Sequence, residues 1–289
     1  MANVIRVGLV GATVTEGGSG WGSGAHVPAL KAVPGYRIKA VCTAHEATAK
    51  ASAAAFGADL AFHDFDAMIA SRDLDLICVV VRVPAHHGLV MKALHAGKAV
   101  FCEWPLGNGL KEAQEMADLA RKKAVPNMSG LQSRSDPVIR YARELIDQDY
   151  IGEVLFANLK IIAAAQLERG PGRIWQGIRS NGANPLTIPG GHSMDTAVYI
   201  LGEFTEVSAR IATRITQWRN TETGETMTVD APDAVGVIGK LQSNAEVSIQ
   251  IATAPSNAPG YRLEIYGRKG ALAISATSTN IGPSRIFGA

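Results

Sequence analysis

Unbroken apolar runs mark the first half of the chain, and segments of helical periodicity separate them. The runs cover residues 4–10, 37–42, 76–81 and 99–102. Continuous runs rich in β-branched residues are typical of parallel strands buried on both faces. Residues 47–56 and 110–123 have helical patterns, the first opened by a capping box from Thr43 to Glu46. The alternation predicts an α/β domain built on a doubly wound parallel sheet.

The pattern changes after residues 126–130, which we take as the last strand of that sheet. Asp136 and Pro137 predict a helix start, with the helix running to about Asp149. Longer strand patterns follow, separated by turn residues, and they predict a mainly antiparallel sheet in an α+β domain. They cover residues 154–165, 207–218, 234–241, 245–253 and 261–265. We therefore expect two domains, 1–130 and 131–289, the second short or truncated and ending in a polar tail from Ser275.

An irregular segment, residues 166–191, precedes a short predicted helix over 193–201. Such a long irregular stretch inside a compact domain is more often functional than accidental.

Composition narrows the possible functions. The 289 residues carry a net charge of +2, which gives no basic excess for binding nucleic acid. Three widely separated cysteines predict buried thiols and neither a disulfide framework nor a metal site. The sequence shows no secretory leader and no apolar run long enough to cross a membrane. We expect a soluble, cytoplasmic protein without nucleic-acid or membrane partners.

A glycine-rich turn follows the first predicted strand. It begins at Gly11, Ala12, Thr13 and Val14 and continues through five glycines to Gly24, before helix-compatible residues 25–33. Backbone amides at such a turn and helix start can bind a pyrophosphate, so Gly20 and Trp21 join the candidate cofactor-binding residues. Thr13 occupies the place of the second glycine of the usual fingerprint, and a flexible surface loop is the alternative.

The second strand ends without the carboxylate that selects NAD. The residues there are Cys42, Thr43, Ala44 and His45, of which Thr43 and His45 could accommodate a 2′-phosphate. NAD and NADP both remain open as cofactors. Thr43 could also simply cap its helix, and the two roles are compatible.

Several phrases together resemble the Gfo/Idh/MocA oxidoreductase family. They are residues 8–11 (GLVG), 24–30 (GAHVPAL), 94–105 (LHAGKAVFCEWP), 134–137 (RSDP) and 190–195 (GGHSMD). The resemblance implies a Rossmann domain followed by an open-faced domain that holds substrate contacts and an oligomer interface, in a homo-oligomer such as a dimer or tetramer. It also implies an NAD(P)-dependent oxidoreductase acting on a sugar, polyol or related hydroxylated molecule.

The same resemblance assigns site residues. It places Arg82, Val83, Pro84, His86 and Glu103 beside the cofactor, and it makes His192 a general base for a substrate hydroxyl. Asp195 could orient His192 or serve as a structural polar partner. Gln132, Arg134 and Trp175 are candidate substrate contacts; for Trp175 a solvated loop is the alternative.

Two positions depart from the family pattern. The usual Glu-Lys-Pro is Glu103-Trp104-Pro105, and an Asp expected before the histidine motif is Ile188. An indole N–H only donates, so Trp104 cannot exchange a proton as Lys does, although its ring could pack on a nicotinamide or sugar or belong to the core. These departures resemble a subgroup that includes the fungal galactose-regulon repressor. A non-catalytic dinucleotide-binding regulator is therefore the second functional hypothesis.

Overall fold

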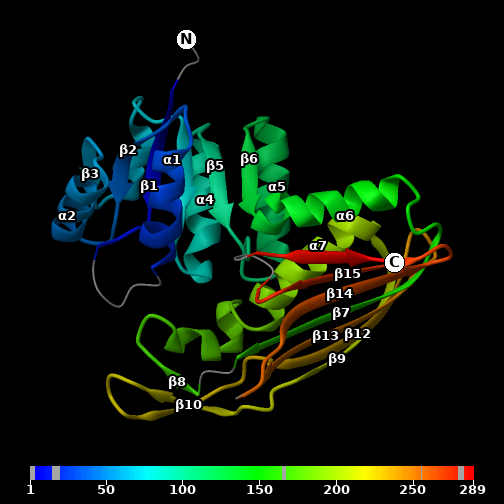
Figure 1. Ribbon diagram of the computed structural model, residues 1–289. Coiled ribbons are helices and arrows are strands. Elements are labelled where there is room, and N and C mark those ends of the chain that lie inside the picture. Colours follow the sequence, from blue (N-terminus) through cyan, green and yellow to red (C-terminus); the bar gives the residue numbers. More distant parts are fainter. Residues whose placement is uncertain (1–3, 15–19, 165–166, 255, 279–282) are drawn as a thin grey trace. The chain divides into compact units, whose positions relative to one another are not determined.

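The computed structural model describes residues 4–14, 20–164, 167–254, 256–278 and 283–289 (Figure 1). The chain divides into two compact units, each described here by itself. The first comprises Met1–Gly130 with Gly170–Arg173, and the second comprises Leu131–Arg169 with Ile174–Ala289.

The first unit is built on a six-stranded parallel sheet in the order β3-β2-β1-β4-β5-β6 (Figure 1). Its strands are β1 (Ile5–Val10), β2 (Tyr36–Cys42), β3 (Leu60–Phe62), β4 (Leu76–Val79), β5 (Ala99–Glu103) and β6 (Asn127–Gly130). The strand order reverses between β1 and β4, as in a doubly wound fold. The predicted parallel sheet is confirmed.

Helices cover this sheet through two apolar clusters. One cluster joins Leu9 of β1 to Phe56, and the other joins Ile77 of β4 to Met68 and Met116. The helices of the first unit are α1 (Val27–Ala32), α2 (Glu46–Phe56), α3 (Phe65–Ala70), α4 (His86–His95) and α5 (Leu110–Lys123).

The capping box predicted at Thr43 is wrong. His45 is the N-cap residue of α2, and no side chain caps that helix start. The Thr43 hydroxyl instead donates to the His45 carbonyl at 3.0 Å and lies 2.7 Å from the Thr48 hydroxyl.

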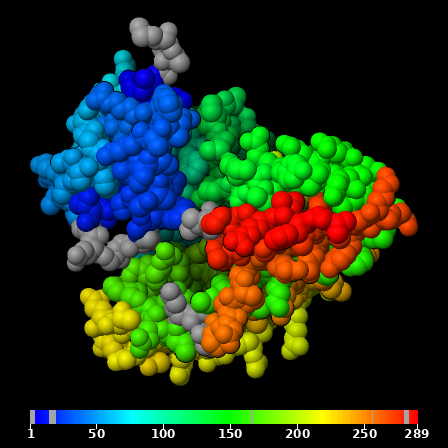
Figure 2. All heavy atoms as spheres, viewed as in Figure 1, coloured from blue at the N-terminus to red at the C-terminus, as the bar shows by residue number. Residues whose placement is uncertain are grey.

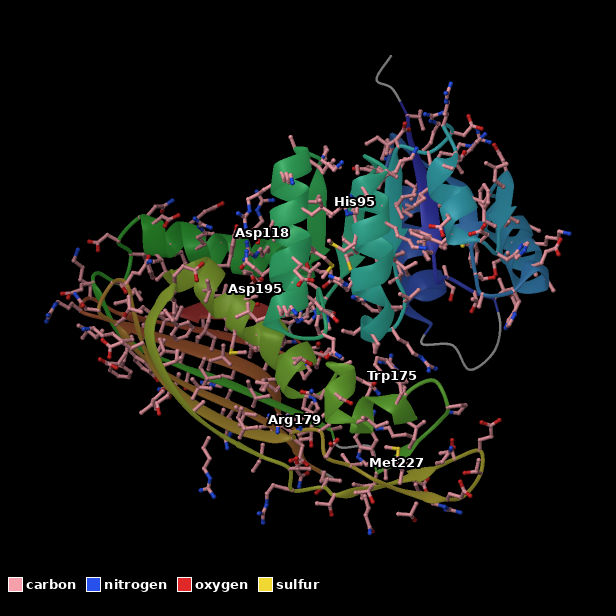
Figure 3. The ribbon with its side chains drawn as sticks, turned by 180° about the vertical axis from the view of Figure 1, so that it is seen from behind. His95, Asp118, Trp175, Arg179, Asp195 and Met227 are labelled. Atoms are coloured by element: carbon pink, nitrogen blue, oxygen red, sulfur yellow. The ribbon has the colours of Figure 1, made fainter. Side chains whose placement is uncertain are left out.

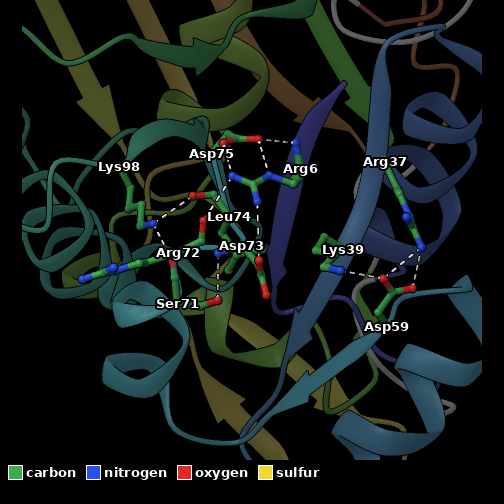
Figure 4. Close-up of polar contacts among 10 residues, drawn as sticks. All are labelled: Arg6, Arg37, Lys39, Asp59, Ser71, Arg72, Asp73, Leu74, Asp75 and Lys98. Carbon is green, nitrogen blue, oxygen red and sulfur yellow. Dashed lines mark hydrogen bonds and ion pairs between the residues drawn. The ribbon is translucent and has the colours of Figure 1, made fainter. Parts of the chain in front are cut away.

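Charged contacts gather where the parallel strands begin (Figure 4). Arg6 binds both carboxylate oxygens of Asp75, at 2.8 and 3.0 Å, and this hydrogen bonding is the main cause that lowers the pKa of Asp75 to about 2. The Lys98 ammonium donates to the carbonyls of Ser71 and Leu74 at 2.6 and 2.8 Å. These contacts fix the amino ends of the strands, which leaves the carboxyl ends as the edge at which doubly wound sheets bind ligands.

The second unit is built on a seven-stranded mixed sheet in the order β16-β15-β14-β7-β13-β12-β9. Only the β7–β13 pair is parallel; the other pairs are antiparallel. The strands are β7 (Val154–Ala164), β9 (Phe204–Ala212), β12 (Ala234–Leu241), β13 (Glu246–Ala254), β14 (Gly260–Gly267), β15 (Ala271–Ala276) and β16 (Arg285–Gly288). The mainly antiparallel sheet is confirmed.

Two expectations for this unit are wrong. The single strand predicted over 207–218 is divided into β9 and β10 (Gln217–Asn220), and β10 belongs to a separate small sheet with β8 (Glu168–Arg169) and β11 (Thr226–Thr228). The segment expected as a polar tail contains β16, which pairs with β15.

Helices α6 (Pro137–Asp147) and α7 (Gly191–Leu201) pack on one face of the large sheet. Ile139, Ala197 and Ile200 from these helices share a core with Leu159 and Ile249 of the strands. Asp136 caps α6 as predicted, because its carboxylate accepts the Val138 amide at 2.8 Å. Figure 2 shows α6 beside β16, where the Ser284 hydroxyl donates to Asp136 at 2.8 Å. The opposite face, which we call the open face, carries Ile238 of β12, the strand next to the edge strand β9, and Ile238 is 65% exposed.

Cys42, Cys78 and Cys102 are all buried and unpaired as disulfides. Burial raises the pKa of the Cys42 thiol to about 11 and that of the Cys78 thiol to about 12. In the part of the chain that the structure describes, no helix is long and apolar enough to span a membrane. The same residues contain no cluster of three or more His, Cys, Asp or Glu side chains suited to a metal ion.

Candidate functional site

The glycine-rich turn begins where β1 ends. Gly11 has a φ of +93°, and a side chain there would collide with the Val80 carbonyl oxygen of the neighbouring strand segment. Its amide donates to the Cys42 carbonyl at 3.0 Å, and the Val14 amide donates to the Ser52 hydroxyl at 3.3 Å. The turn therefore requires glycine at its first position. Residues 15–19 lie outside the described part of the chain.

A helix starts inside the glycine cluster, earlier than expected. Gly22–His26 form a π-helical turn that continues directly into α1, so Gly22 and Gly24 are helical and not part of the turn. A Cβ on Gly22 would come within 2.9 Å of the Ala12 Cα, so glycine lets the helix start approach the turn. Gly20, with a φ of +69°, leads into this start, and Trp21 is its N-cap residue. Close contact between turn and helix start fits a pyrophosphate site.

Thr43 and His45, the two candidate ribose contacts, follow the end of β2. The Thr43 hydroxyl is hydrogen-bonded to the His45 backbone and Thr43 is buried. His45 is exposed beside it, at the N-cap of α2. A polar contact with a 2′-phosphate stays a prediction for both residues.

A buried pair joins the helix start to the end of β5. His26 Nε2 lies 2.6 Å from Glu103 Oε1, and the two side chains are 15% and 11% exposed. The His26 ring also packs edge-on against Phe101, and a Cβ on Gly130 would come within 3.1 Å of the Glu103 carboxylate. Glu103 is thus held from two sides at the carboxyl edge of the sheet.

His26 belongs to one of the phrases that carry the family resemblance, but the sequence alone does not predict its pairing with Glu103. His26 stands 77 positions from Glu103, and no local spacing connects them. The sequence alone also does not predict the role of Ser52, a polar residue in the Ala-rich helix α2, whose hydroxyl binds the turn.

The segment expected to contact the cofactor follows β4, and its His86 side chain contacts the backbone of neighbouring segments. Val83 and Pro84 lie in a 3-10 turn (Val83–Ala85), and Arg82 donates to the Pro171 carbonyl at 3.3 Å. The His86 ring is buried, with Nδ1 2.9 Å from the Pro105 carbonyl oxygen and Nε2 3.0 Å from that of Val81. Both ring nitrogens face backbone carbonyls, and a contact of His86 with a cofactor stays a prediction. The ring ties the end of β4 to the segment after β5.

Trp104 directly follows β5 and is half-buried. It therefore occupies the carboxyl edge of the parallel sheet, where the sequence predicted it. Its packing on a nicotinamide or a sugar stays a prediction.

In the second unit, His192 lies buried in the first turn of α7, and Asp195 lies one turn further on (Figure 3). The Asp195 carboxylate accepts hydrogen bonds from Arg134 Nε at 3.0 and 3.1 Å. This pairing raises the pKa of Arg134. Asp195 is thus an ion-pair partner of Arg134, and the roles of Asp195 toward His192 and of Arg134 toward a substrate stay predictions.

The remaining predicted residues lie in two short turns. Gln132 is in a 3-10 turn (Gln132–Ser135) between β6 and α6. Trp175 is in another (Ile174–Gly177) between β7 and α7, near Arg179 and Met227 in Figure 3. The Trp175 carbonyl accepts the Asn181 side-chain amide at 2.7 Å. Residues 166–191, which were expected to be irregular, contain several short helical turns. One of them is a π-helical turn (Leu186–Gly190) that contains Ile188.

Comparison with known families matches both units. The profile described as "Oxidoreductase family, NAD-binding Rossmann fold" matches residues 5–131, and the profile described as "Gal80p, C-terminal domain" matches residues 137–276.

Two curated dehydrogenases and one solved structure are similar to this chain. Dehydrogenase aclE of Aspergillus oryzae is 31% identical over 97% of this chain and 79% of its own. D-apiose dehydrogenase of Paraburkholderia graminis is 27% identical over 90% and 71%. A crystal structure of a super-repressor mutant of Gal80p from Saccharomyces cerevisiae covers 99% of this chain and 78% of its own, with a TM-score of 0.87 at 24% identity. At that identity the likeness shows the shared fold alone.

Proposed function

The chain belongs to the Gfo/Idh/MocA oxidoreductase family, whose first domain binds NAD, and from this premise we propose that it is an NAD(P)-dependent oxidoreductase acting on a sugar, a polyol or a related hydroxylated small molecule. The observation that carries the proposal is the close-packed turn at Gly11 with the helix start against it, since this is the element that binds a dinucleotide pyrophosphate.

The residues of the first unit fit such a cofactor at the carboxyl edge of the sheet. The segments Gly11–Val14 and Gly20–Trp21 would hold the pyrophosphate, and His45 would lie near the adenosine ribose. Arg82, Val83, Pro84 and Glu103 would border the nicotinamide end. When bound, the nicotinamide ring supplies hydride transfer. The protein would position that ring and exclude water from it, and the indole of Trp104 would pack against the face of the ring.

Proton transfer in this proposal belongs to His192. An imidazole can both accept and donate a proton, as exchange with a substrate hydroxyl requires. Gln132 and Trp175 would contact the substrate, while Arg134 and Asp195 would keep the first turns of α7 in place through their ion pair.

The second candidate function is a non-catalytic dinucleotide-binding regulator that acts through a protein partner. The match of the second unit to the Gal80p C-terminal domain supports it. The family resemblance supports it too, because it implies a Lys and an Asp at the positions of Trp104 and Ile188. In this hypothesis the protein keeps the cofactor site but lacks the Lys and the Asp that take part in proton transfer in the family.

We propose that the chain forms a homo-oligomer through the open face of its seven-stranded sheet. Support comes from Ile238, an exposed apolar residue of β12 on that face, in a sheet whose other face packs against α6 and α7.

The test separates these readings. Purified protein is denatured, any released dinucleotide is identified, and the absorbance of reduced nicotinamide is followed with a panel of sugars and polyols. An enzyme consumes or forms reduced nicotinamide, and His192→Gln lowers this rate by about 10²-fold or more while leaving dinucleotide affinity unchanged. A regulator binds the dinucleotide without turnover. Failure to bind any nicotinamide dinucleotide contradicts both readings.

Trp104 gives a further test. If the native protein is a regulator, Trp104→Lys restores a proton-handling side chain and turnover appears only in that variant, whereas Trp104→Phe, the matched control, remains inactive. Turnover by the native protein that is lost in Trp104→Lys supports native catalysis with the indole as part of the site.

A further inference from the structure

Strand β9 leaves one edge of the seven-stranded sheet open. Among the described strands it pairs with β12 alone, and all of residues 205–211 are exposed. A long edge strand presents a row of unpaired N–H and C=O groups, so it is a ready template for another strand.

The two faces of this edge differ. Val207, Ala209 and Ile211 lie opposite core-facing residues of β12, yet Val207 remains 65% and Ile211 46% exposed. The apolar side of the strand therefore extends beyond the part of the sheet that the helices cover. An edge that pairs with a second strand would place other apolar side chains beside these two.

The charges of β9 are arranged symmetrically. Glu206 and Arg210 stand two residues before and two residues after Ser208, all three on the open face. In the described part of the chain, neither charge takes part in an ion pair. An antiparallel pairing of two copies centred on Ser208 places Glu206 opposite the partner subunit's Arg210, and does so twice because of the two-fold symmetry.

We propose that β9 is a homotypic interface at which two copies of this chain join edge to edge, with Ser208 on the two-fold axis. The same register sets Val207 opposite Ala209 of the partner subunit and brings the partner subunit's Ile211 within diagonal reach. This inference rests on the proposed homo-oligomer and adds a second interface to the one through the open sheet face. Two such interfaces together would give a tetramer.

Charge exchange tests the pairing directly. Glu206→Arg and Arg210→Glu each replace two attractive pairs by two repulsive ones, and each weakens self-association about tenfold at low salt, measured by sedimentation. An equimolar mixture of the two variants regains native association, because an edge carrying two positive charges then meets one carrying two negative charges. Glu222→Arg, an exposed charge reversal in the turn after β10, is the matched control and changes nothing.

Crosslinking tests the register. In the proposed pairing position 208 lies opposite itself, and directly opposite residues of an antiparallel pair are within disulfide distance, so Ser208→Cys forms a crosslinked dimer under mild oxidation. Thr205→Cys, the control, lies opposite position 211 and does not crosslink. The native cysteines are buried and do not interfere.

Charge reversals that leave self-association unchanged, or a Ser208→Cys protein that stays uncrosslinked, overturn the edge interface. Ile238→Asp then tells whether the open face alone holds the oligomer: loss of association in that variant preserves the proposed homo-oligomer without the edge. A native protein that sediments as a monomer at all concentrations overturns both.

Discussion

At the scale of single residues, the turn at Gly11 depends on its conformation and its lack of a side chain. Gly11→Ala would force Ala into a positive φ and against the Val80 carbonyl, so we expect a loss of at least about 2 kcal/mol in the free energy of unfolding. Urea denaturation measures it. Gly24→Ala is the matched control, since that helical position has nothing within 4 Å of an added Cβ. It should be neutral or stabilising by about 0.5–1 kcal/mol.

Residue burial also predicts how the thiols react. With the pKa of Cys42 raised to about 11 and that of Cys78 to about 12, almost no thiolate is present at neutral pH, and the thiolate is the reactive form. A disulfide reagent should therefore label none of the three cysteines in the native protein and all three after denaturation. Fast labelling of the native protein would contradict the buried positions.

Some residues of the candidate site could be predicted from their neighbours in the sequence, and others depend on contacts between distant segments. Gly11 and Trp104 were predicted because each directly follows an apolar strand, and the ends of parallel strands meet at one edge. The His26–Glu103 pair was not predicted, because it depends on a contact between a helix start and a strand distant in sequence. His86 was assigned to the cofactor by resemblance, but its environment of backbone carbonyls is set by tertiary packing alone.

At the scale of elements, the start of α6 depends on one side chain. Asp136→Ala removes the cap on the Val138 amide and the acceptor for Ser284, and we expect a loss of about 1 kcal/mol in the free energy of unfolding. Asp136→Asn keeps an acceptor oxygen for the Val138 amide, and its side-chain NH2 can donate to the Ser284 hydroxyl, so this variant should stay within a few tenths of a kcal/mol of the native value. Equal losses in the two variants would show that the charge matters and not the cap.

Elements with local signals were predicted well, and elements defined by pairing were not. Helix α5 has the predicted bounds because amphipathic periodicity and glycine before it determine them. The break between β9 and β10 depends on each strand pairing in a different sheet, and β16 is a strand only because β15 lies beside it. The alternation of apolar and polar residues along a strand does not indicate which other strand pairs with it.

At the scale of the whole molecule, acid stability should depend on the charged contacts at the amino ends of the first sheet. Asp75 has an ordinary pKa of 3.8 and a folded pKa of about 2, so its bond to Arg6 stabilises the fold fully above the ordinary pKa and is lost as pH falls through the folded one. Arg6→Met should therefore destabilise the protein at neutral pH and progressively less between about pH 4 and pH 2. Urea denaturation across that range measures the difference.

A double variant isolates this effect. When Asp75→Asn is already present, Arg6→Met should change stability by an amount that no longer varies over the acid range. A pH-dependent difference that persists without the carboxylate would assign the effect to another group.

The position of β7 in the second sheet has a consequence for synthesis on the ribosome. Strand β7 is the first of its sheet to be made, yet it lies in the middle and pairs with β13 and β14, whose residues follow their β7 partners by roughly ninety residues or more. The parallel sheet of the first unit, by contrast, has all its strands once residue 130 has emerged. During translation the first unit can fold early, while β7 waits with both edges open, and this interval is when a nascent chain most needs a chaperone.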